Sequence, residues 1–312
     1  MINKNFLQVA VGVVKNANNQ ILIALRNKAS HQGGLWEFPG GKVEEGETHQ
    51  QALARELKEE VDIVVTSSIP LITVRHHYPE ISVQLNVFLV ENFSGQAKGL
   101  QDQEIRWINV DELDHFEFPK ANRTIITAIQ LPPCYAIIDD TDEPLVFAKL
   151  QKMLSNGVKL IQARLKSSSA ATVKAFLEQA YPLCKQHNAW LLVNSAVEQT
   201  DIAQVDGIHL TSNDLLTISQ RPANMRWVSA SCHNLEQLQQ AQRIGVDFVV
   251  LAPVLPTQSH PGVQTLGWQR FTALATTVNF PVYALGGMSL SNLASARQAG
   301  AQGIAGISAF LD

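Results

Sequence analysis

Residues 33–63 read GGLWEFPGGKVEEGETHQQALARELKEEVDI, a glycine-rich loop that runs directly into helix-forming residues. Five glycines and Pro39 fall between residues 33 and 46. Over residues 48–61 the apolar positions recur at helical spacing; they are Ala52, Leu53, Leu57 and Val61. Glu47 and Thr48 stand where acidic and hydroxyl side chains satisfy the free N–H groups of a helix start. The segment therefore predicts a glycine loop that feeds a helix.

Three carboxylates lie on one face of this helix. Glu56, Glu59 and Glu60 are spaced i, i+3 and i+4, so they repel one another within a single turn. Arg55 and Lys58 are not spaced to neutralise all three, which disfavours a simple solvated face. Mg²⁺ prefers oxygen ligands and binds a few carboxylates together with substrate phosphates. The cluster predicts a site for Mg²⁺, or for Mn²⁺.

Strand patterns surround the loop and the helix. Val- and Ile-rich runs at 7–14 and 20–25 flank the turn residues 16–19, and 69–75, 81–90 and 105–108 read as further strands. A last helix is expected near 120–130, where Leu131-Pro132-Pro133 ends it. We therefore expect one domain over residues 1–131 and another over residues 134–312.

The spacing of Gly41, Glu47, residues 55–60 and Ile63 resembles the Nudix box, the signature of hydrolases of nucleoside diphosphates linked to another group. This resemblance implies an α/β/α sandwich with a mixed sheet. The one departure is Asp62, where the family has glycine at the helix exit. Because aspartate tolerates the left-handed conformation, we expect a small cost in stability and intact chemistry.

Residues 36–42, Gly12, Arg26 and residues 119–122 are similar to the MutT subgroup, the 8-oxo-dGTP diphosphatases. The resemblance implies that Asn122 reads the oxidised purine, that Phe38 lines the base pocket, and that Arg26 and His31 lie near the phosphates. Arg55 is expected to orient a carboxylate, with Glu47 and Gly41 supporting the loop. Strict alignment places Gln101 where the subgroup has a further carboxylate, so Asp102 or Glu104 is expected to replace it.

The resemblance assigns these residues to three roles. Those expected in catalysis are Arg55, Glu56, Glu59, Glu60 and Glu104. Those expected to bind substrate are Arg26, His31, Phe38, Gly40, Gly41 and Asn122. Those expected to hold the metal are Gly40, Glu56, Glu59 and Glu60.

The second half alternates short apolar runs with amphipathic ones. The runs lie near 135–139, 160–165, 190–194, 207–210, 227–231, 247–252, 282–285 and 303–307. Eight buried parallel strands in strict alternation with helices predict a (β/α)8 TIM barrel, with about 180 residues against about 250 for its class. An open doubly wound sheet is the competing fold, but no GxGxxG follows the first strand.

Residues 134–312 resemble thiamine-phosphate synthases and their TenI relatives, through residues 161–166, 206–210, 231–233, 256–257 and 286–288. Ser195 replaces the synthase aspartate that holds Mg²⁺, Thr211-Ser212 replaces a Gly-Gln pair, and His260 replaces a lysine. We therefore expect a degenerate synthase-like domain. The resemblance implies a ligand site that contains Gln162, Arg164, Lys166, Asp214, Gly286, Gly287 and Ser308.

Composition restricts the partners. The chain has 312 residues, 46% of them hydrophobic, and a net charge of −4. Residues 1–130 carry that entire negative balance and residues 131–312 are neutral, so no bulk positive charge attracts a nucleic-acid polymer. Three distant cysteines form neither a disulfide framework nor a metal motif and suggest a reducing cytoplasm. No run approaches the ~20 apolar residues of a membrane helix, and the N-terminus reads as a strand rather than a signal peptide.

Three functional hypotheses follow. The first is a Mg²⁺-dependent enzyme that converts 8-oxo-dGTP to 8-oxo-dGMP and pyrophosphate and so protects DNA from mutation. The second keeps a hydrolase but assigns it a thiamine-related diphosphate, with the barrel as a TenI-type enzyme. The third treats the barrel as a module that binds a phosphate or thiazole compound without turnover.

Overall fold

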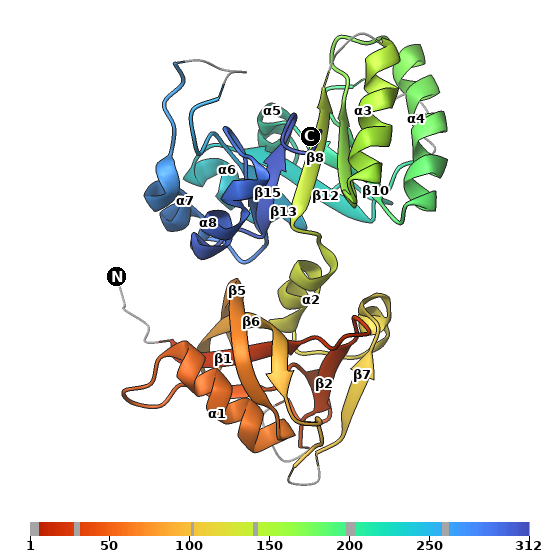
Figure 1. The fold of residues 1–312 in the computed structure, drawn as a ribbon. Coiled ribbons are helices and arrows are strands. Elements are labelled where there is room, and N and C mark those ends of the chain that lie inside the picture. The colour runs from red at the N-terminus through yellow and green to blue at the C-terminus, as the bar shows by residue number, and fades with distance from the viewer. Residues whose placement is uncertain are drawn as a thin grey trace. The chain divides into compact units, whose positions relative to one another are not determined.

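The computed structural model describes residues 6–27, 32–100, 103–139, 143–197, 204–257 and 262–311. The chain divides into two compact units, residues 1–130 and residues 131–312 (Figure 1). Four positions that the sequence analysis singled out lie outside the described residues: His31, Gln101, Asp102 and His260.

The first unit contains seven strands and two α-helices among its described residues. They are β1 (Leu7–Val14), β2 (Ile21–Leu25), β3 (Trp36–Glu37), β4 (Gly40–Lys42), α1 (His49–Val61), β5 (Val64–His77), β6 (Ser82–Ser94), β7 (Ile105–Ile108) and α2 (Asn122–Gln130), with the 3₁₀ helix η1 (Val110–His115) before α2. One sheet has the order β4-β1-β6-β5 and a smaller one the order β3-β2-β7. The larger sheet is mixed, because β1 pairs with β6 in parallel and with β4 antiparallel.

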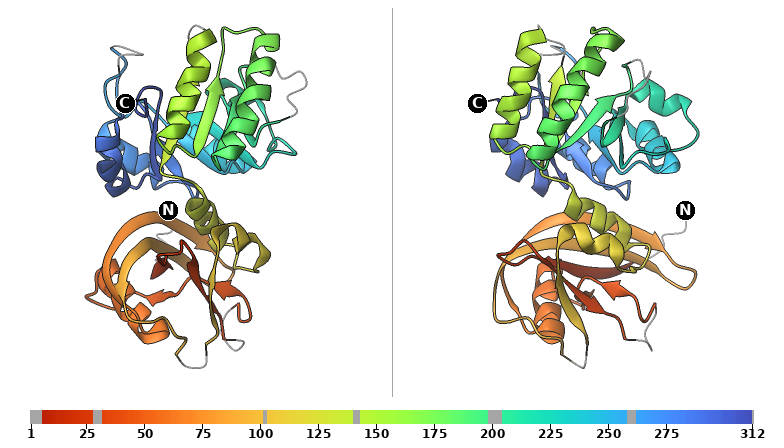
Figure 2. Two further views of the ribbon diagram at one scale, coloured as in Figure 1. Left: turned by 45° about the vertical axis from the view of Figure 1, so that its right-hand side comes forward. Right: turned by 90° about the vertical axis from the view of Figure 1, so that its right-hand side faces the viewer.

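Helix α1 covers one face of the larger sheet (Figures 1 and 2). Its four apolar positions are all buried against Ala10, Phe88 and Val90. The Thr48 side chain caps the helix by accepting from the Gln51 N–H, and Asp62 ends it in the left-handed conformation with φ 55°. The cap expected of Thr48 and the left-handed conformation expected at Asp62 are confirmed, the Glu47 side chain binds Arg55, and the small cost in stability at Asp62 stays a prediction. A second cluster of buried apolar side chains, which includes Phe38 and Ile125, packs on the opposite face of the sheet.

The second unit is a closed barrel of eight parallel strands (Figure 1). The strands are β8 (Cys134–Asp139), β9 (Leu160–Arg164), β10 (Trp190–Asn194), β11 (Gly207–Leu210), β12 (Trp227–Cys232), β13 (Phe248–Leu251), β14 (Val282–Ala284) and β15 (Gly303–Gly306). The helices are α3 (Glu143–Ser155), α4 (Ala170–Gln186), α5 (Ser212–Thr217), α6 (Leu235–Ile244), α7 (Gly267–Ala275) and α8 (Leu293–Gln298), with the 3₁₀ helix η2 (Leu290–Asn292) before α8. The prediction of a barrel rather than an open sheet is confirmed.

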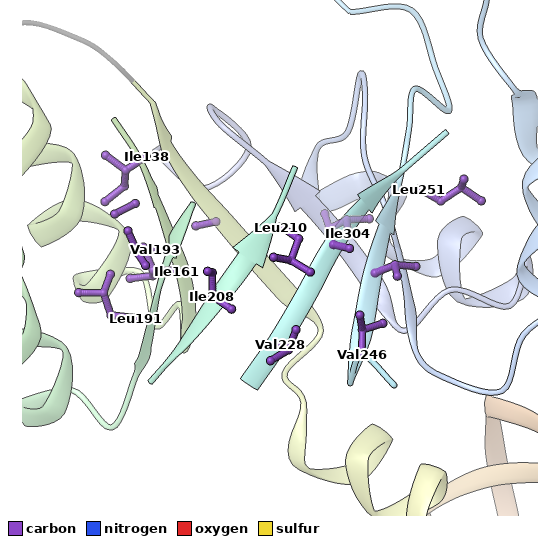
Figure 3. Close-up of a cluster of buried hydrophobic side chains, with 14 of the residues drawn as sticks. Ile138, Ile161, Leu191, Val193, Ile208, Leu210, Val228, Val246, Leu251 and Ile304 are labelled. Atoms are coloured by element: carbon purple, nitrogen blue, oxygen red, sulfur yellow. The ribbon is translucent and has the colours of Figure 1, made fainter. Parts of the chain in front are cut away.

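Two layers of side chains build this barrel. Alternate strand residues point outward and pack aliphatic side chains under the helices, as Figure 3 shows for Ile138, Val193 and Leu251. The inward residues form a separate cluster that includes Tyr135 and Phe248. Leu131 belongs to this inner cluster, and its carbonyl accepts a 2.8 Å hydrogen bond from Gln302. The second unit therefore begins before its first strand.

The connection between β10 and β11 lies partly outside the described residues. Between β10 and β11 the described residues, 195–197 and 204–206, contain no helix. Instead, the N–H of Ser195 bonds to the carbonyl of His209, so the chain leaving β10 is bound to the end of β11. None of the helices within the described ranges is long and apolar enough to cross a membrane.

Candidate active site

The site in the first unit is organised by Arg55. Its guanidinium donates to both carboxylate oxygens of Glu47, at 2.8 and 2.9 Å, and to the carbonyl of Lys42 at 3.0 Å. It also donates to Glu56 at 2.8 Å and to Glu59 at 3.3 Å. Hydrogen bonds from Arg55 lower the pKa of Glu47 to about 2. Arg55 thus binds two of the three glutamates, while Glu60 accepts from Gly40, in agreement with the expectation that Arg55 does not neutralise all three.

Glu60 is held differently from the other two glutamates. Its carboxylate accepts a 2.9 Å hydrogen bond from the N–H of Gly40. Burial raises its pKa to about 7, since the Gly40 bond only partly offsets desolvation and the carboxylates of Glu37 and Glu56 add repulsion. The acidic face of α1 is therefore divided: one part is bound by Arg55 and the other faces the glycine loop.

Two adjacent glycines let the loop approach both α1 and β1. A Cβ on Gly41 would lie 2.2–2.4 Å from the carboxylate atoms of Glu56. A Cβ on Gly40 would lie 2.2 Å from the carbonyl oxygen of Ala10, and Gly40 has φ 149°. These distances are shorter than any van der Waals contact, so the sequence Gly40-Gly41 is what allows the loop to reach the carboxylates.

The donor chemistry at this loop fits a hard divalent cation. Glu56, Glu59, Glu60 and the carbonyl of Gly40 are all oxygen donors, the type that Mg²⁺ prefers. In the part of the chain that the structure describes, no three His, Cys, Asp or Glu side chains are positioned to hold an ion. Arg55 binds Glu56 and Glu59, and the Gly40 N–H binds Glu60. These carboxylates would have to reorient to coordinate a cation.

Glu104 takes part in a surface ion pair. Its carboxylate accepts two hydrogen bonds from Arg106, at 2.8 and 2.6 Å. The Arg106 guanidinium in turn lies 4.9 Å from the centre of a Trp36 ring. To serve as a further metal ligand, Glu104 would have to leave Arg106, so that role stays a prediction.

An aromatic wall, made by Phe38, Phe118 and Tyr78, lies near the start of α2. Phe38 is buried and stacks on Phe118 with ring centres 5.3 Å apart. Asn122, 7% exposed, begins α2, and its N–H donates to the carbonyl of Pro119. Tyr78 hydrogen-bonds to the main chain of Ala121 and packs against the same apolar cluster. The sequence predicted Phe38 and Asn122 as substrate-binding residues. It gave no signal for Tyr78, which follows β5 outside any periodic pattern.

Arg26 and Glu37 form an ion pair beside this site. Arg26 directly follows β2, and Glu37 lies in β3, which pairs with β2. Burial raises the pKa of Glu37 to about 6, although the charge and hydrogen bond of Arg26 act in the opposite direction. Arg26 was predicted from the sequence, whereas Glu37 has no conspicuous spacing to any other acid and was not predicted.

A polar chain crosses the interior of the barrel. Asn194 donates to Gln162 at 3.0 Å, and Gln162 donates to the Tyr135 hydroxyl at 2.9 Å. The hydroxyl lies 3.1 Å from Nδ1 of His209, whose Nε2 lies 2.8 Å from the Ser231 hydroxyl. Burial, together with the charges of Arg164 and Lys166, lowers the pKa of His209 to about 3. This histidine is therefore neutral and serves as a hydrogen-bonding group.

Ser195 belongs to a hydrogen-bonded set at the ends of β10 and β11. Its hydroxyl donates to Asp214 and accepts from the N–H of Thr211 at 2.9 Å. The Thr211 hydroxyl donates to the same Asp214 oxygen at 2.7 Å. These two hydroxyls, with the nearby charge of Lys166, lower the pKa of Asp214. Asp214 is thus an ionised carboxylate held by hydroxyl groups.

The other expected ligand residues of the barrel lie at the same ends of its strands. Arg164 ends β9 and Lys166 follows it. Gly286 and Gly287 follow β14 with φ 98° and 66°, and Cβ atoms there would meet the segment 253–256 at 2.4–2.9 Å. Ser308 is exposed after β15. The carboxyl ends of barrel strands are where ligands bind in this fold.

Comparison with known proteins identifies both units. A family model described as "NUDIX domain" matches residues 10–128, and one described as "Thiamine monophosphate synthase" matches residues 134–310. The chain therefore belongs to the Nudix family through its first unit and to the thiamine monophosphate synthase family through its second. The Nudix box and the barrel predicted from the sequence are both confirmed.

Curated relatives match each unit over most of their own length. An "8-oxo-dGTP diphosphatase" of Escherichia coli is 37% identical over 124 residues, which are 40% of this chain and 96% of the relative. One of Proteus vulgaris is 46% identical over 96 residues, 31% of this chain and 86% of the relative. A "Putative thiamine-phosphate synthase 2" of Aquifex aeolicus is 33% identical over 186 residues, 59% of this chain and 100% of the relative.

Proposed function

We propose that the first unit is a Mg²⁺-dependent nucleoside triphosphate pyrophosphohydrolase of the cytoplasmic nucleotide pool that prefers 8-oxo-dGTP. The contact between Gly41 and the carboxylate of Glu56 carries this proposal, because it brings an acidic helix against a glycine loop. Relatives named 8-oxo-dGTP diphosphatase match 40% and 31% of this chain at 37% and 46% identity. Acidic oxygens beside a loop with exposed main chain suit a metal-bound polyphosphate.

The reaction adds a water oxygen to a phosphorus of the triphosphate. The bond between that phosphorus and its leaving bridging oxygen breaks, nucleoside monophosphate and pyrophosphate form, and one proton of the water passes to a base. Mg²⁺ bound by Glu56, Glu59, Glu60 and Gly40 would supply charge neutralisation and a lower pKa for bound water. Arg55 fixes Glu56 and Glu59, and one of the three glutamates accepts the proton.

The buried end of α2 supports a preference for the oxidised purine. Oxidation at C8 turns the N7 acceptor of guanine into an N–H donor. The amide of Asn122 offers both an acceptor and donors, so it can pair with the altered edge. Phe38 and Phe118 form an apolar surface next to it.

Pyrophosphate release by the full chain tests this function. We expect faster turnover at low concentration for 8-oxo-dGTP than for dGTP, loss of activity in excess EDTA, and loss in Glu59→Gln. Glu178→Gln, an exposed change on α4, is the matched control and should stay active. Full activity in EDTA, or equal kcat/KM for the two nucleotides, would refute the proposal. Competition with hydroxymethylpyrimidine diphosphate tests the alternative substrate class.

We further propose that the barrel lacks thiamine-phosphate synthase activity and binds a phosphate or thiazole compound instead. Ser195 supplies a hydroxyl where the synthase has an aspartate, and Asp214 is already bound by Ser195 and Thr211. A Mg²⁺-diphosphate substrate would therefore lose a ligand. Rescue of a synthase-null strain at normal expression would overturn this. Thermal stabilisation by a thiazole phosphate without product formation would support a binding module, whereas product formation would indicate TenI-type catalysis.

A further inference from the structure

The Arg26–Glu37 ion pair is fixed at both ends by the main chain. The N–H of Arg26 donates to the carbonyl of Leu35 at 2.9 Å, and the N–H of Gly34 donates back to the carbonyl of Arg26 at 3.1 Å. In the same ladder Leu25 pairs with Trp36 and Ala24 with Glu37. Because both backbones are bound to each other, the carboxylate of Glu37 restricts where the Arg26 guanidinium can point.

A contribution to folding stability does not explain why the chain has this ion pair. The side chains of Arg26 and Glu37 are 26% and 18% exposed, so both charges are largely removed from water. The burial of Glu37 outweighs the attraction of Arg26, since the pKa of its carboxyl lies above the ordinary value. A buried pair with incomplete compensation costs stability compared with apolar residues. Retaining such a pair makes sense where the orientation of the arginine is useful.

The pair lies near both parts of the candidate site. The charges of Glu37 and Arg26 both act on Glu60 of α1, which binds the N–H of Gly40 only three residues beyond Glu37. The charge of Arg26 also acts on Tyr78, which hydrogen-bonds to Ala121 beside Asn122. Arg26 is thus close to the acidic helix and to the aromatic wall. A nucleotide with its base on the aromatic wall and its phosphates toward the acidic helix would bring those phosphates near the guanidinium.

We propose that Glu37 is a positioning residue that holds the Arg26 guanidinium toward the phosphates of the bound nucleotide. This inference rests on the proposed hydrolase function, because it assigns Arg26 a phosphate of the same substrate. Arginine suits the role through its planar set of N–H donors, which a carboxylate on one edge can hold in a fixed plane. Glu37 itself touches no reacting atom in this arrangement.

A double-mutant cycle tests the inference on the full chain. The variants are Arg26→Ala, Glu37→Ala and both together, measured for kcat and KM with 8-oxo-dGTP and for the affinity of dGTP in Ca²⁺. We expect each single change to reduce kcat/KM and dGTP affinity about 10- to 100-fold, and the double variant to be no worse than Arg26→Ala. Glu37→Gln should recover part of the loss, because its amide oxygen still accepts from Arg26.

Glu91→Ala provides a matched control, because Glu91 also belongs to an ion pair of the first unit, with Lys15 at 3.0 Å. It should leave both readouts unchanged. If the wild-type protein turns over 8-oxo-dGTP, the hydrolase function stands. In that case, additive losses in the cycle, or a fall in melting temperature that accounts for the lost activity of Glu37→Ala, would overturn the role of Glu37. If the wild-type protein shows no turnover but the effects of the two changes on dGTP affinity are coupled, the role of Glu37 stands and the hydrolase function is rejected. Neither turnover nor coupling would reject both.

Discussion

Replacing the two glycines of the loop one at a time should separate chemistry from folding. In Gly41→Ala the new Cβ would lie 2.2 Å from a carboxylate that ends a flexible side chain. Real contacts of this kind exceed about 3 Å, so the Glu56 carboxylate must move by about 1 Å, and a displacement of that size costs about 100-fold in rate. We expect kcat to fall by about that factor with little loss of stability.

Gly40→Ala is the opposite case. Its Cβ would lie 2.2 Å from the Ala10 carbonyl and 2.9 Å from the Val11 Cα, and the φ of 149° is unfavourable for alanine. Backbone cannot yield as a side chain does, so we expect a loss of about 3 kcal/mol or more in the first unit.

Pyrophosphate release and scanning calorimetry, run on both variants in parallel, distinguish these outcomes. The calorimetric transition of the first unit should move to lower temperature in Gly40→Ala and stay nearly constant in Gly41→Ala. Wild-type kcat in Gly41→Ala would show that the Glu56 carboxylate is not needed where the structure places it. Equal destabilisation of the two variants would refute the distinction between side-chain and backbone contacts.

Three other changes have defined outcomes. The carboxyl of Glu37 has a pKa of about 6 in the folded protein, against an ordinary value of 4.5, so the folded state binds more protons between these pH values. The free energy of unfolding should therefore fall by about 2 kcal/mol as pH rises through that window. Chemical denaturation at pH 4.5 and 7.5 should show a smaller change for Glu37→Gln than for the wild type, and an equal change would count against the assignment. Ser195→Asp places a second carboxylate beside Asp214, so the melting temperature without metal should drop and Mg²⁺ should raise it again. A melting temperature that does not respond to Mg²⁺ would mean that other differences from the synthase sequence also prevent metal binding. Leu131→Ala should destabilise the barrel by about 2–5 kcal/mol while hydrolysis at 25 °C persists; calorimetry and the pyrophosphate assay check this, and an unchanged barrel transition would contradict it.

Periodicity predicted the elements whose side chains pack on a core. Residues 190–194, 207–210 and 105–108 form strands at the predicted bounds, since most of their side chains are apolar and packed on a core. The pattern was less informative at β5, predicted as 69–75 and observed as Val64–His77. Its first residues are mostly exposed and its pairing with β6 contains irregularities, so hydrogen bonds extend the strand where alternation of hydrophobicity does not.

Short strands inside the glycine loop were also missed. Gly40–Lys42 pairs antiparallel with β1 through its main chain, which side-chain patterns do not report. The same limit applies to the site. Spacing located the three glutamates on one helical turn, but only the folded loop shows that Arg55 takes two of them and Gly40 the third. Tyr78 and Glu37 come from segments that sequence spacing does not relate to α1.

The place where the two units join has a practical meaning for anyone who separates them. Leu131 fills the floor of the barrel, its carbonyl binds Gln302, and the carbonyl of Pro133 accepts from the N–H of Ile304. A barrel expressed from residue 134 would lack the Leu131 side chain. It would also lose the hydrogen bonds from Gln302 to Leu131 and from Ile304 to Pro133. The cut, or any inserted spacer, belongs between Gln130 and Leu131.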